Sequence, residues 1–442
     1  MWLLPILSVL CSGASRVFYR LQVDGSRVPS EGPVLLVANH PNALVDPIVV
    51  AAVAGRPVRF LAKATLFTDS RVGWLVKAAG AIPVYRKQDD PTALGRNRDV
   101  FEAVFEEMSK GSAIGIFPEG ISHSAPSLAE IKTGAARIAI GAYGRTGEAF
   151  PIIPVGIVPE RKERFRSEMR AVIGHPIDWI DLADGGTEDR EAVGELTGRI
   201  EEGLRGVTLN LERWEDRPLV ETAESIWALK EGEAEGPAQQ VSRFEITTRI
   251  LAAVRRGSVE RWTSLVRDLD MHFRRLTLFR LRPGDLYADT TLRSVVRWTA
   301  RRLYMLGALA LIVTFFGFVT FLIPRHATGV LTAKMDPTVD ATSTYKILIG
   351  TLIYTSWIVA MSLAGLMLLG PWIGLTLLAF LPLFGMVSLS LRERWRWVAH
   401  EVRRFLLLRS GSLVIKELRS EQERLSRELG DLFVAWEAGL LD

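Results

Sequence analysis

The apolar positions of this chain change their pattern along its length. Between residues 33 and 174, short apolar runs recur, each bounded by glycine, proline or charged residues. They are PVLLVAN (33–39), VRFLA (58–62), AIPVY (81–85), SAIGIF (112–117), PIIPVGIV (151–158) and RAVIG (170–174). Continuous apolar runs of this length are typical of strands that are covered on both faces. The pattern therefore predicts a buried sheet in the first half of the chain.

Stretches with helical spacing lie between and after these strands. One predicted helix face consists of Val100, Phe101, Val104, Phe105 and Met108. Residues 137–142 and 188–204 have helical patterns as well. Strands that alternate with helices indicate an α/β layered fold, which we assign to residues 15–214.

From residue 215 the pattern changes to helices that are rich in arginine. A Glu/Gly/Pro linker at residues 231–240 is followed by apolar residues at helical spacing. These are Leu251, Val254, Trp262, Leu265, Val266, Leu269 and Phe273, beside Arg255, Arg256, Arg267, Arg274 and Arg275. Such a surface fits either helices lying on anionic headgroups or an ordinary helical subdomain, and both interpretations stay open. We assign residues 215–298 to a basic helical region.

Two long runs without charge follow, at residues 303–323 and 347–391, and Gly370-Pro371 interrupts the second. Because about 20 apolar residues span a bilayer, we predict a transmembrane region at residues 299–391. Its expected spans are about 303–323, 347–369 and 371–391, and a charged helical tail (392–442) follows.

Both flanks of this region are basic, which conflicts with three full crossings. The flanking arginines are Arg293, Arg297, Arg301 and Arg302 before it, and Arg392, Arg394, Arg396, Arg403 and Arg404 after it. The positive-inside rule favours both flanks in the cytoplasm. Either the Gly-Pro half is re-entrant or one basic flank is an exception, and the sequence leaves both open.

The N-terminal residues 1–14 are apolar but too short to span a bilayer, and no Lys or Arg precedes Arg16 as a secretory signal would require. We expect an interfacial helix there, with a true anchor as the alternative. The single cysteine, Cys11, excludes internal disulfides, a Cys-rich zinc site and an iron–sulfur cluster.

Composition and charge narrow the class of protein. The chain of 442 residues is 48% apolar and 24% charged, unlike a disordered chain. Its net charge of +4 is too small to indicate nucleic acid as a partner and suits a protein resting on anionic lipid. These features predict a membrane-attached enzyme or transporter whose folded bulk lies in a reducing compartment.

The stretch NHPNALVDP, residues 39–47, carries the first candidate chemistry. His40 follows a predicted strand, and α/β folds place reactive groups at the C-terminal ends of strands. An imidazole can take a proton from an alcohol, and a carboxylate such as Asp46 on its other nitrogen fixes the tautomer and stabilises the imidazolium. A histidine and an aspartate near a strand end are also common in ordinary loops.

Two further strand ends strengthen this interpretation. GAIPVYRK (80–87) places Arg86 just after one predicted strand, and FPEGISHS (117–124) places Glu119 and Gly120 just after another. A guanidinium near a turn with free backbone N–H groups suits a phosphate dianion. No HExxH motif, Cys-rich motif or paired acidic set indicates a metal site.

Four motifs, NH‥DP, GxIPVxR, FPEG and IPVGI, occur in order over residues 33–158. In this the chain resembles the glycerophospholipid acyltransferases. The resemblance implies a layered acyltransferase domain with a mixed sheet flanked by helices, with His40 as general base and Asp46 as its partner. It also implies Arg86 as a phosphate ligand, Glu119 and Gly120 as an acceptor-binding turn, and Pro154 in the motif linked to the acyl-donor side.

The sequence departs from the commonest family pattern in two places. Five residues instead of four separate His40 from Asp46, which resembles the glycerol-3-phosphate/dihydroxyacetone-phosphate branch with C-terminal membrane segments. The usual FPEGTRS is FPEGISHS, so the arginine of that motif is missing. His123, Lys132 or Lys63 are candidates for the lost charge, and Lys132 lies in a turn that opens a helix.

The resemblance implies a membrane enzyme that transfers a fatty acyl group from an acyl thioester to glycerol-3-phosphate or dihydroxyacetone phosphate in phosphatidic acid synthesis. Its expected partners are acyl-CoA or acyl carrier protein, a phosphorylated glycerol acceptor and membrane lipids, with no cofactor, metal or nucleic acid. The catalytic domain is expected on the cytoplasmic face of a multi-pass protein. The alternatives are a lysophosphatidate acyltransferase and an inactive lipid-handling protein. A small transporter would require charges within the spans, which both charge-free runs lack.

Overall fold

The computed structural model describes residues 13–69, 73–85, 97–231, 236–287, 307–339, 341–410 and 413–440. Of the predicted interfacial helix at 1–14, only residues 13 and 14 are described. The first basic flank, at 293–302, lies wholly outside the described residues. The chain forms two compact units. Unit 1 comprises Met1–Asp216, Ala234–Ile246 and Pro337–Ile347, and unit 2 comprises Arg217–Glu233, Thr247–Asp336 and Leu348–Asp442.

Unit 1 is built around a sheet whose strand order is β1-β7-β6-β2-β5-β3-β4. Its strands are β1 (Arg20–Gly25), β2 (Val34–Ala38), β3 (Val58–Lys63), β4 (Ile82–Val84), β5 (Ala113–Ile116), β6 (Ile152–Pro159) and β7 (Glu168–Ile173). All described pairs are parallel except β6 with β7. The predicted α/β fold with a mixed sheet is therefore confirmed.

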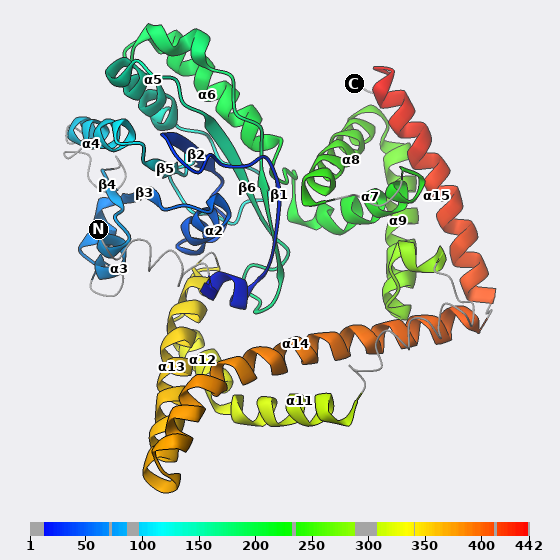
Figure 1. The fold of residues 1–442 in the computed structure, drawn as a ribbon. Coiled ribbons are helices and arrows are strands. Elements are labelled where there is room, and N and C mark those ends of the chain that lie inside the picture. The colour runs from blue at the N-terminus through cyan, green and yellow to red at the C-terminus, as the bar shows by residue number, and fades with distance from the viewer. Residues whose placement is uncertain are drawn as a thin grey trace. The chain divides into compact units, whose positions relative to one another are not determined.

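Helices cover both faces of this sheet (Figure 1). The helices α4 (Asn97–Ser109), α5 (Gly134–Thr146) and α6 (Arg190–Arg205) bury their apolar residues against one face. The helix α2 (Val45–Ala54) packs on the other face. Strand β2 is buried along its whole length because it lies between these two layers. This explains why its sequence is a continuous apolar run.

Two segments from later in the chain complete unit 1. The Asp24 carboxylate accepts a hydrogen bond from the Ala238 backbone N–H at 3.0 Å, and Val241 is fully buried among valines of β6 and β7. Ile347, at the start of a later helix, joins the apolar core beneath α2. The α/β unit therefore includes short segments beyond the residues 15–214 that the sequence pattern assigned to it.

Unit 2 contains the helices α7 (Arg217–Glu231), α9 (Val259–Phe279) and α15 (Leu413–Glu437), which pack on one another. It also contains the second half of α8 (Pro237–Gly257), from Thr247 onward. Part of the apolar stripe of α9 is buried in this packing: Leu265 and Leu269 are at most 1% exposed, whereas Phe273 is 40% exposed. Trp227 of α7 stacks on Phe433 of α15, with ring centroids 3.7 Å apart. The buried part of the stripe thus packs within a helical subdomain, and contact of the basic helices with anionic headgroups stays a prediction.

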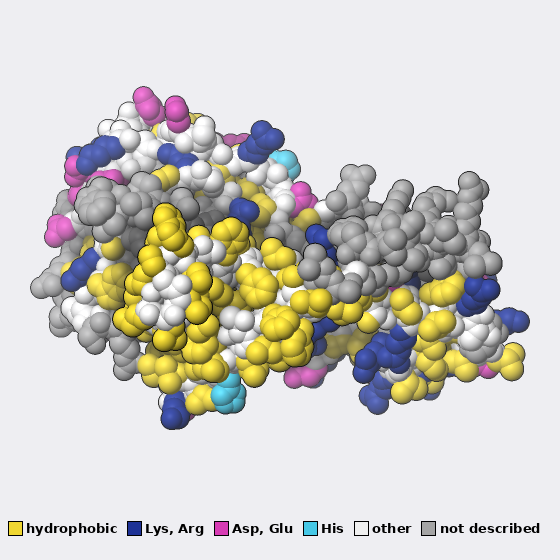
Figure 2. Space-filling model, turned by 60° about the horizontal axis from the view of Figure 1, so that its bottom comes forward, with side chains coloured by type: hydrophobic (Ala, Val, Ile, Leu, Met, Phe, Trp, Pro, Cys, Tyr) yellow, Lys and Arg dark blue, Asp and Glu magenta, His cyan; other side chains and the backbone are white. Residues whose placement is uncertain are grey.

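The apolar region forms α11 (Ala308–Thr320), α12 (Leu322–Lys334), α13 (Thr342–Leu369) and α14 (Pro371–Arg409). By length and composition, α13 and α14 could each cross a membrane. The helices α11 and α12, bent by 45° between them, form either a third, broken span or a re-entrant loop. Figure 2 shows hydrophobic side chains gathered on the face that carries these helices. Gly370, with a φ of 102°, separates α13 from α14, and Gly374 allows the backbones of these two helices to approach closely.

Candidate active site

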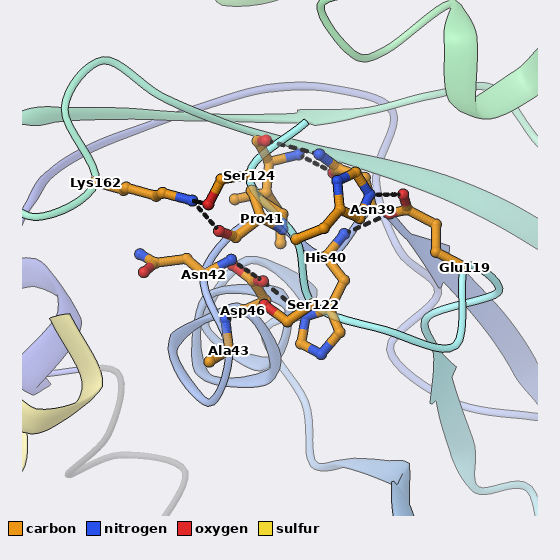
Figure 3. Close-up of polar contacts among 12 residues, drawn as sticks. Asn39, His40, Pro41, Asn42, Ala43, Asp46, Glu119, Ser122, Ser124 and Lys162 are labelled. Atoms are coloured by element: carbon orange, nitrogen blue, oxygen red, sulfur yellow. Dashed lines mark hydrogen bonds and ion pairs between the residues drawn. The ribbon is translucent and has the colours of Figure 1, made fainter. Parts of the chain in front are cut away.

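The predicted pair of His40 and Asp46 comes together at the C-terminal end of β2. His40 follows β2 after Asn39, and Asp46 lies in the first turn of α2. The chain turns sharply between them, and Ala43 adopts a φ of 44° at the bend. As a result, His40 Nδ1 lies 2.8 Å from Asp46 Oδ2 (Figure 3). The Asp46 carboxylate is fully buried, whereas 19% of the His40 side chain is exposed.

The Asp46 carboxylate is held by the loop that it follows. Its Oδ2 also accepts a hydrogen bond from the Asn42 backbone N–H at 2.7 Å. Burial raises the pKa of Asp46, and the bonds from His40 and Asn42 together with the charge of Lys162 act in the opposite direction. The buried carboxylate thus depends on the imidazole as its main partner, which is the arrangement that stabilises an imidazolium.

Aromatic stacking fixes the plane of the His40 ring. The imidazole stacks on Phe117 with centroids 4.1 Å apart, and Phe117 in turn stacks on Phe60 of β3. Gly115 of β5 makes room for this stack, because a Cβ there would lie 2.3 Å from the Phe60 ring. Among the described residues, His40 Nε2 has no hydrogen-bond partner. This nitrogen is therefore positioned and available to exchange a proton with a ligand.

Glu119 connects three segments around the histidine. Its buried carboxylate accepts hydrogen bonds from the backbone N–H groups of His40 and Ala129, both at 2.8 Å, and forms a short contact with His123 Nε2. Gly120 follows with a φ of 73°, a conformation that favours glycine. Glu119 thus orders the loop that carries His40, and His123 is occupied with this carboxylate.

The predicted cationic residues lie around this edge at different places. Lys63 ends β3, and because β2, β5 and β3 are parallel, it lies at the same edge as His40. Lys132 lies beside Gly120 and directs its Nζ to Glu130 at 2.6 Å. Strand β4 ends at Val84 on this same edge, and the predicted phosphate ligand Arg86 lies outside the described residues.

The structure does not bring Pro154 to this group of residues. Pro154 is buried within β6, opposite Val37 of β2. Its ring packs closely against Gly174, since a Cβ added to Gly174 would lie 2.7 Å from the Pro154 Cγ. Its position is thus one of packing between strands. We find no contact that links it to an acyl-donor site among the described residues.

Several residues that support the site were not singled out by the sequence. The Asn39 side chain bonds to the backbone of Ile157 through both its amide nitrogen and its oxygen, at 3.0 and 2.7 Å. It thereby joins the end of β2 to β6. Lys162, between β6 and β7, donates to the Pro41 carbonyl at 2.9 Å and to Ser124 Oγ at 2.6 Å. Only the position of Asn39 directly before His40 could have indicated such a role.

Part of the chain is similar in sequence to known acyltransferases. Residues 20–158 match the model of the Acyltransferase family. The chain is 31% identical over 133 residues to glycerol-3-phosphate O-acyltransferase 1 of Saccharomyces cerevisiae, a match that covers 29% of this chain and 18% of the yeast protein. It is 29% identical over 168 residues to the chloroplastic 1-acyl-sn-glycerol-3-phosphate acyltransferase LPAT1 of Arabidopsis thaliana, covering 36% and 44%.

A solved structure also resembles part of the chain. The 1-acyl-sn-glycerophosphate acyltransferase PlsC of Thermotoga maritima matches with a TM-score of 0.34 and 20% identity, over 46% of this chain and 78% of that one. The chain spans less than half the length of the yeast and Arabidopsis relatives. The family match at residues 20–158 includes the His40 loop and the strands from β1 to β5. Residues 20–158 thus match the Acyltransferase family, and the two relatives that they resemble are a glycerol-3-phosphate and a 1-acyl-sn-glycerol-3-phosphate acyltransferase.

Proposed function

We propose that the protein transfers a fatty acyl group from an acyl thioester to the hydroxyl of glycerol-3-phosphate or dihydroxyacetone phosphate, in the synthesis of phosphatidic acid. One observation carries this proposal. His40 is bonded through Nδ1 to the buried Asp46, while its Nε2 is directed away from that carboxylate at the edge where the parallel strands end (Figure 3). This is the arrangement that a general base for an alcohol requires.

The reaction follows from these roles. His40 Nε2 takes the proton of the acceptor hydroxyl while the hydroxyl oxygen attacks the thioester carbonyl. Asp46 stabilises the imidazolium that forms, as the carboxylate of a catalytic triad does. The tetrahedral intermediate collapses, the carbon–sulfur bond breaks, and the imidazolium returns the proton to the departing thiolate. The products are an ester and a free thiol, and no covalent enzyme intermediate is needed.

Phosphate recognition is assigned to basic residues of this domain. Arg86, two residues after the end of β4, and Lys63, at the end of β3, are our candidates, together with Lys132 beside Gly120. A charge-assisted hydrogen bond contributes about 1.5–3 kcal/mol. Arg86→Ala should therefore raise the KM of the phosphorylated acceptor about 10- to 150-fold, with little change in the KM of the acyl donor.

A second acceptor is supported by a particular relative. The similarity to the Arabidopsis 1-acyl-sn-glycerol-3-phosphate acyltransferase makes lysophosphatidate the alternative acceptor. The donor in either case is acyl-CoA or acyl carrier protein, used as a co-substrate without a further cofactor. We also propose that the protein is a multi-pass membrane protein with this domain on the cytoplasmic face, which would place the site beside its lipid product.

The test is an acceptor competition with the full-length protein in detergent. Labelled acyl-CoA is supplied with glycerol-3-phosphate, dihydroxyacetone phosphate or lysophosphatidate, and the products are identified by mass spectrometry. We expect one of the first two to be acylated with the highest kcat/KM, and His40→Ala to abolish the product. Preference for lysophosphatidate would establish the alternative. Absence of acyl transfer to all three, from either CoA or carrier protein, would overturn the proposal.

A further inference from the structure

The loop between β6 and β7, residues 160–167, contacts the start of a candidate membrane span. Ser343, in the first turn of α13, donates a short hydrogen bond from its Oγ to the Lys162 carbonyl. Lys346 donates from its Nζ to the neighbouring Glu163 carbonyl at 2.5 Å. These residues all belong to unit 1, and Ile347 next to them is buried in its core. The beginning of α13 thus holds this loop from one side.

The other side of the loop 160–167 contacts the loop that carries His40. The Lys162 ammonium donates to the Pro41 carbonyl at 2.9 Å and to Ser124 Oγ at 2.6 Å (Figure 3). Pro41 directly follows His40, and Ser124 follows the turn at Glu119. One ammonium therefore connects the two loops that make up the candidate site.

A buried tyrosine provides a second connection between the same partners. Tyr19 donates from its hydroxyl to the Lys162 carbonyl and accepts a bond from Asn42 Nδ2 at 2.8 Å. Burial raises the pKa of Tyr19, so its hydroxyl stays a neutral donor. The backbone N–H of Asn42 is the group that bonds to Asp46. Both the side chain and the carbonyl of Lys162 thus act on the loop between His40 and Asp46.

We propose that Lys162 is a positioning residue for the His40–Asp46 pair, and that the first turns of α13 hold Lys162 in place. Acyl transfer would then depend on the position of the first turns of α13. From Ile347 to Leu369 this helix continues as an apolar segment long enough to cross a membrane. This inference rests on the proposed function, since it concerns the rate of that reaction. Lys162 itself need not touch either substrate.

The kinetic test separates positioning from binding. Lys162→Met keeps the length of the side chain but removes the ammonium, and a small displacement of a catalytic group can cost about 100-fold in rate. We expect kcat to fall about 10- to 100-fold while both KM values stay within about threefold. Lys162→Arg, which retains the charge and its donors, should recover most of the rate. Ser343→Ala should lower kcat about 2- to 10-fold, the equivalent of one neutral hydrogen bond.

A matched control lies on the same helix. Ser362→Ala also removes a hydroxyl from α13, but the Ser362 hydroxyl bonds within the helix to the Ile358 carbonyl at 2.8 Å. This variant should keep the wild-type kcat. The inference is overturned if Lys162→Met retains its kcat, if it raises a KM instead, or if Lys162→Arg loses as much rate as Lys162→Met. The part of the inference that concerns α13 is overturned if Ser343→Ala and Ser362→Ala have the same kcat.

A measurement without turnover distinguishes this inference from the proposed function. Hydrogen–deuterium exchange of the full-length protein in detergent, followed by mass spectrometry, reports on peptides that cover residues 39–46. Their amides include those of Asn42 and Ala43, which bond to Asp46 and to Ser122. We expect faster exchange of these peptides in Lys162→Met and unchanged exchange in the α6 peptide 192–204. An inactive wild type with this exchange change would overturn only the proposed function, whereas unchanged exchange would overturn the positioning role.

Discussion

Each unit of this protein contains a histidine whose Nδ1 contacts a carboxylate, His40 with Asp46 in unit 1 and His272 with Glu421 in unit 2, and these two pairs differ in their surroundings. In unit 1, His40 is 19% exposed, and its Nε2 has no partner among the described residues. In unit 2, His272 of α9 is completely buried, with Nδ1 3.3 Å from Glu421 Oε2 and Nε2 3.0 Å from Gln422 Oε1. Both ring nitrogens of His272 are therefore used to join α9 to α15, whereas only one ring nitrogen of His40 has a partner among the described residues.

The partners of the two carboxylates also differ. Asp46 is fully buried, and its ionised form is supported by the histidine and by the loop that it closes. Glu421 is shared between His272 and Arg275, which bonds to it at 3.0 Å. An imidazolium at His272 would thus meet a carboxylate that is already neutralised by a guanidinium. A carboxylate next to a histidine is consequently a weak sign of catalysis, and the free nitrogen and the strand-end position are the informative features.

The largest expected difference between the two pairs is in activity. His40→Ala should lower kcat about 100- to 10,000-fold, the usual effect of losing a general base. His272→Leu should leave kcat within about threefold in protein that remains folded. Both variants are assayed with the full-length protein and the preferred acceptor. Equal losses would show that the geometric distinction between the two histidines is mistaken.

Asp46→Asn should lower kcat to a similar extent, because an amide no longer fixes the imidazole tautomer or stabilises its charged form. Its effect on stability should have the opposite sign. Burial raises the pKa of Asp46, so the carboxylate form costs stability that an amide does not. Activity should therefore fall while the thermal midpoint stays equal or rises. A lower midpoint at neutral pH would mean that the carboxylate contributes net stability to the fold.

The raised pKa of Asp46 also predicts how the difference in thermal midpoint between Asp46→Asn and the wild type changes with pH. A carboxyl whose pKa is raised by folding binds its proton more tightly in the folded state, so its contribution to stability falls as pH rises above the unfolded value near 4. Asp46→Asn lacks this dependence. The thermal midpoint of the variant minus that of the wild type should thus become more positive from pH 4 towards pH 7. His40→Gln serves as a control that retains Asp46, and a difference that shrinks with pH would contradict the assignment.

His272→Leu should act on stability. It leaves Glu421 and Gln422 without their imidazole partner in a buried interface, which costs about 1–3 kcal/mol for each unsatisfied polar group. We expect a lower thermal midpoint of the full-length protein, measured in detergent by near-ultraviolet circular dichroism. The matched control, His400→Leu, removes a histidine that bonds to a single carbonyl. Its midpoint should change less.

The sequence predicted the parts of the molecule that local patterns encode. The apolar runs gave the central strands because burial on both faces leaves a continuous apolar sequence. Strand β1 was not predicted, since RLQVDG is an exposed edge strand without such a run. His40 and Asp46 could be identified because they are six positions apart in one loop. Lys162 could not, because only the tertiary structure places the end of β6 beside the end of β2 and so brings Lys162 to Pro41.

The smallest expected effect concerns Lys132 as the replacement for the arginine that the FPEGISHS motif lacks. Lys132 pairs with Glu130 in the free protein, and both side chains are largely exposed. If Lys132 binds the acceptor phosphate, it must exchange this carboxylate for the phosphate, and the exchange opposes binding. Glu130→Gln should then lower the acceptor KM roughly two- to fivefold, the range for an exposed ion pair, and Lys132→Met should raise it. Since water and salt screen this pair, both effects should shrink at high ionic strength. The double variant decides between direct and indirect action: if Glu130 acts only through Lys132, adding Glu130→Gln to Lys132→Met should leave the KM unchanged.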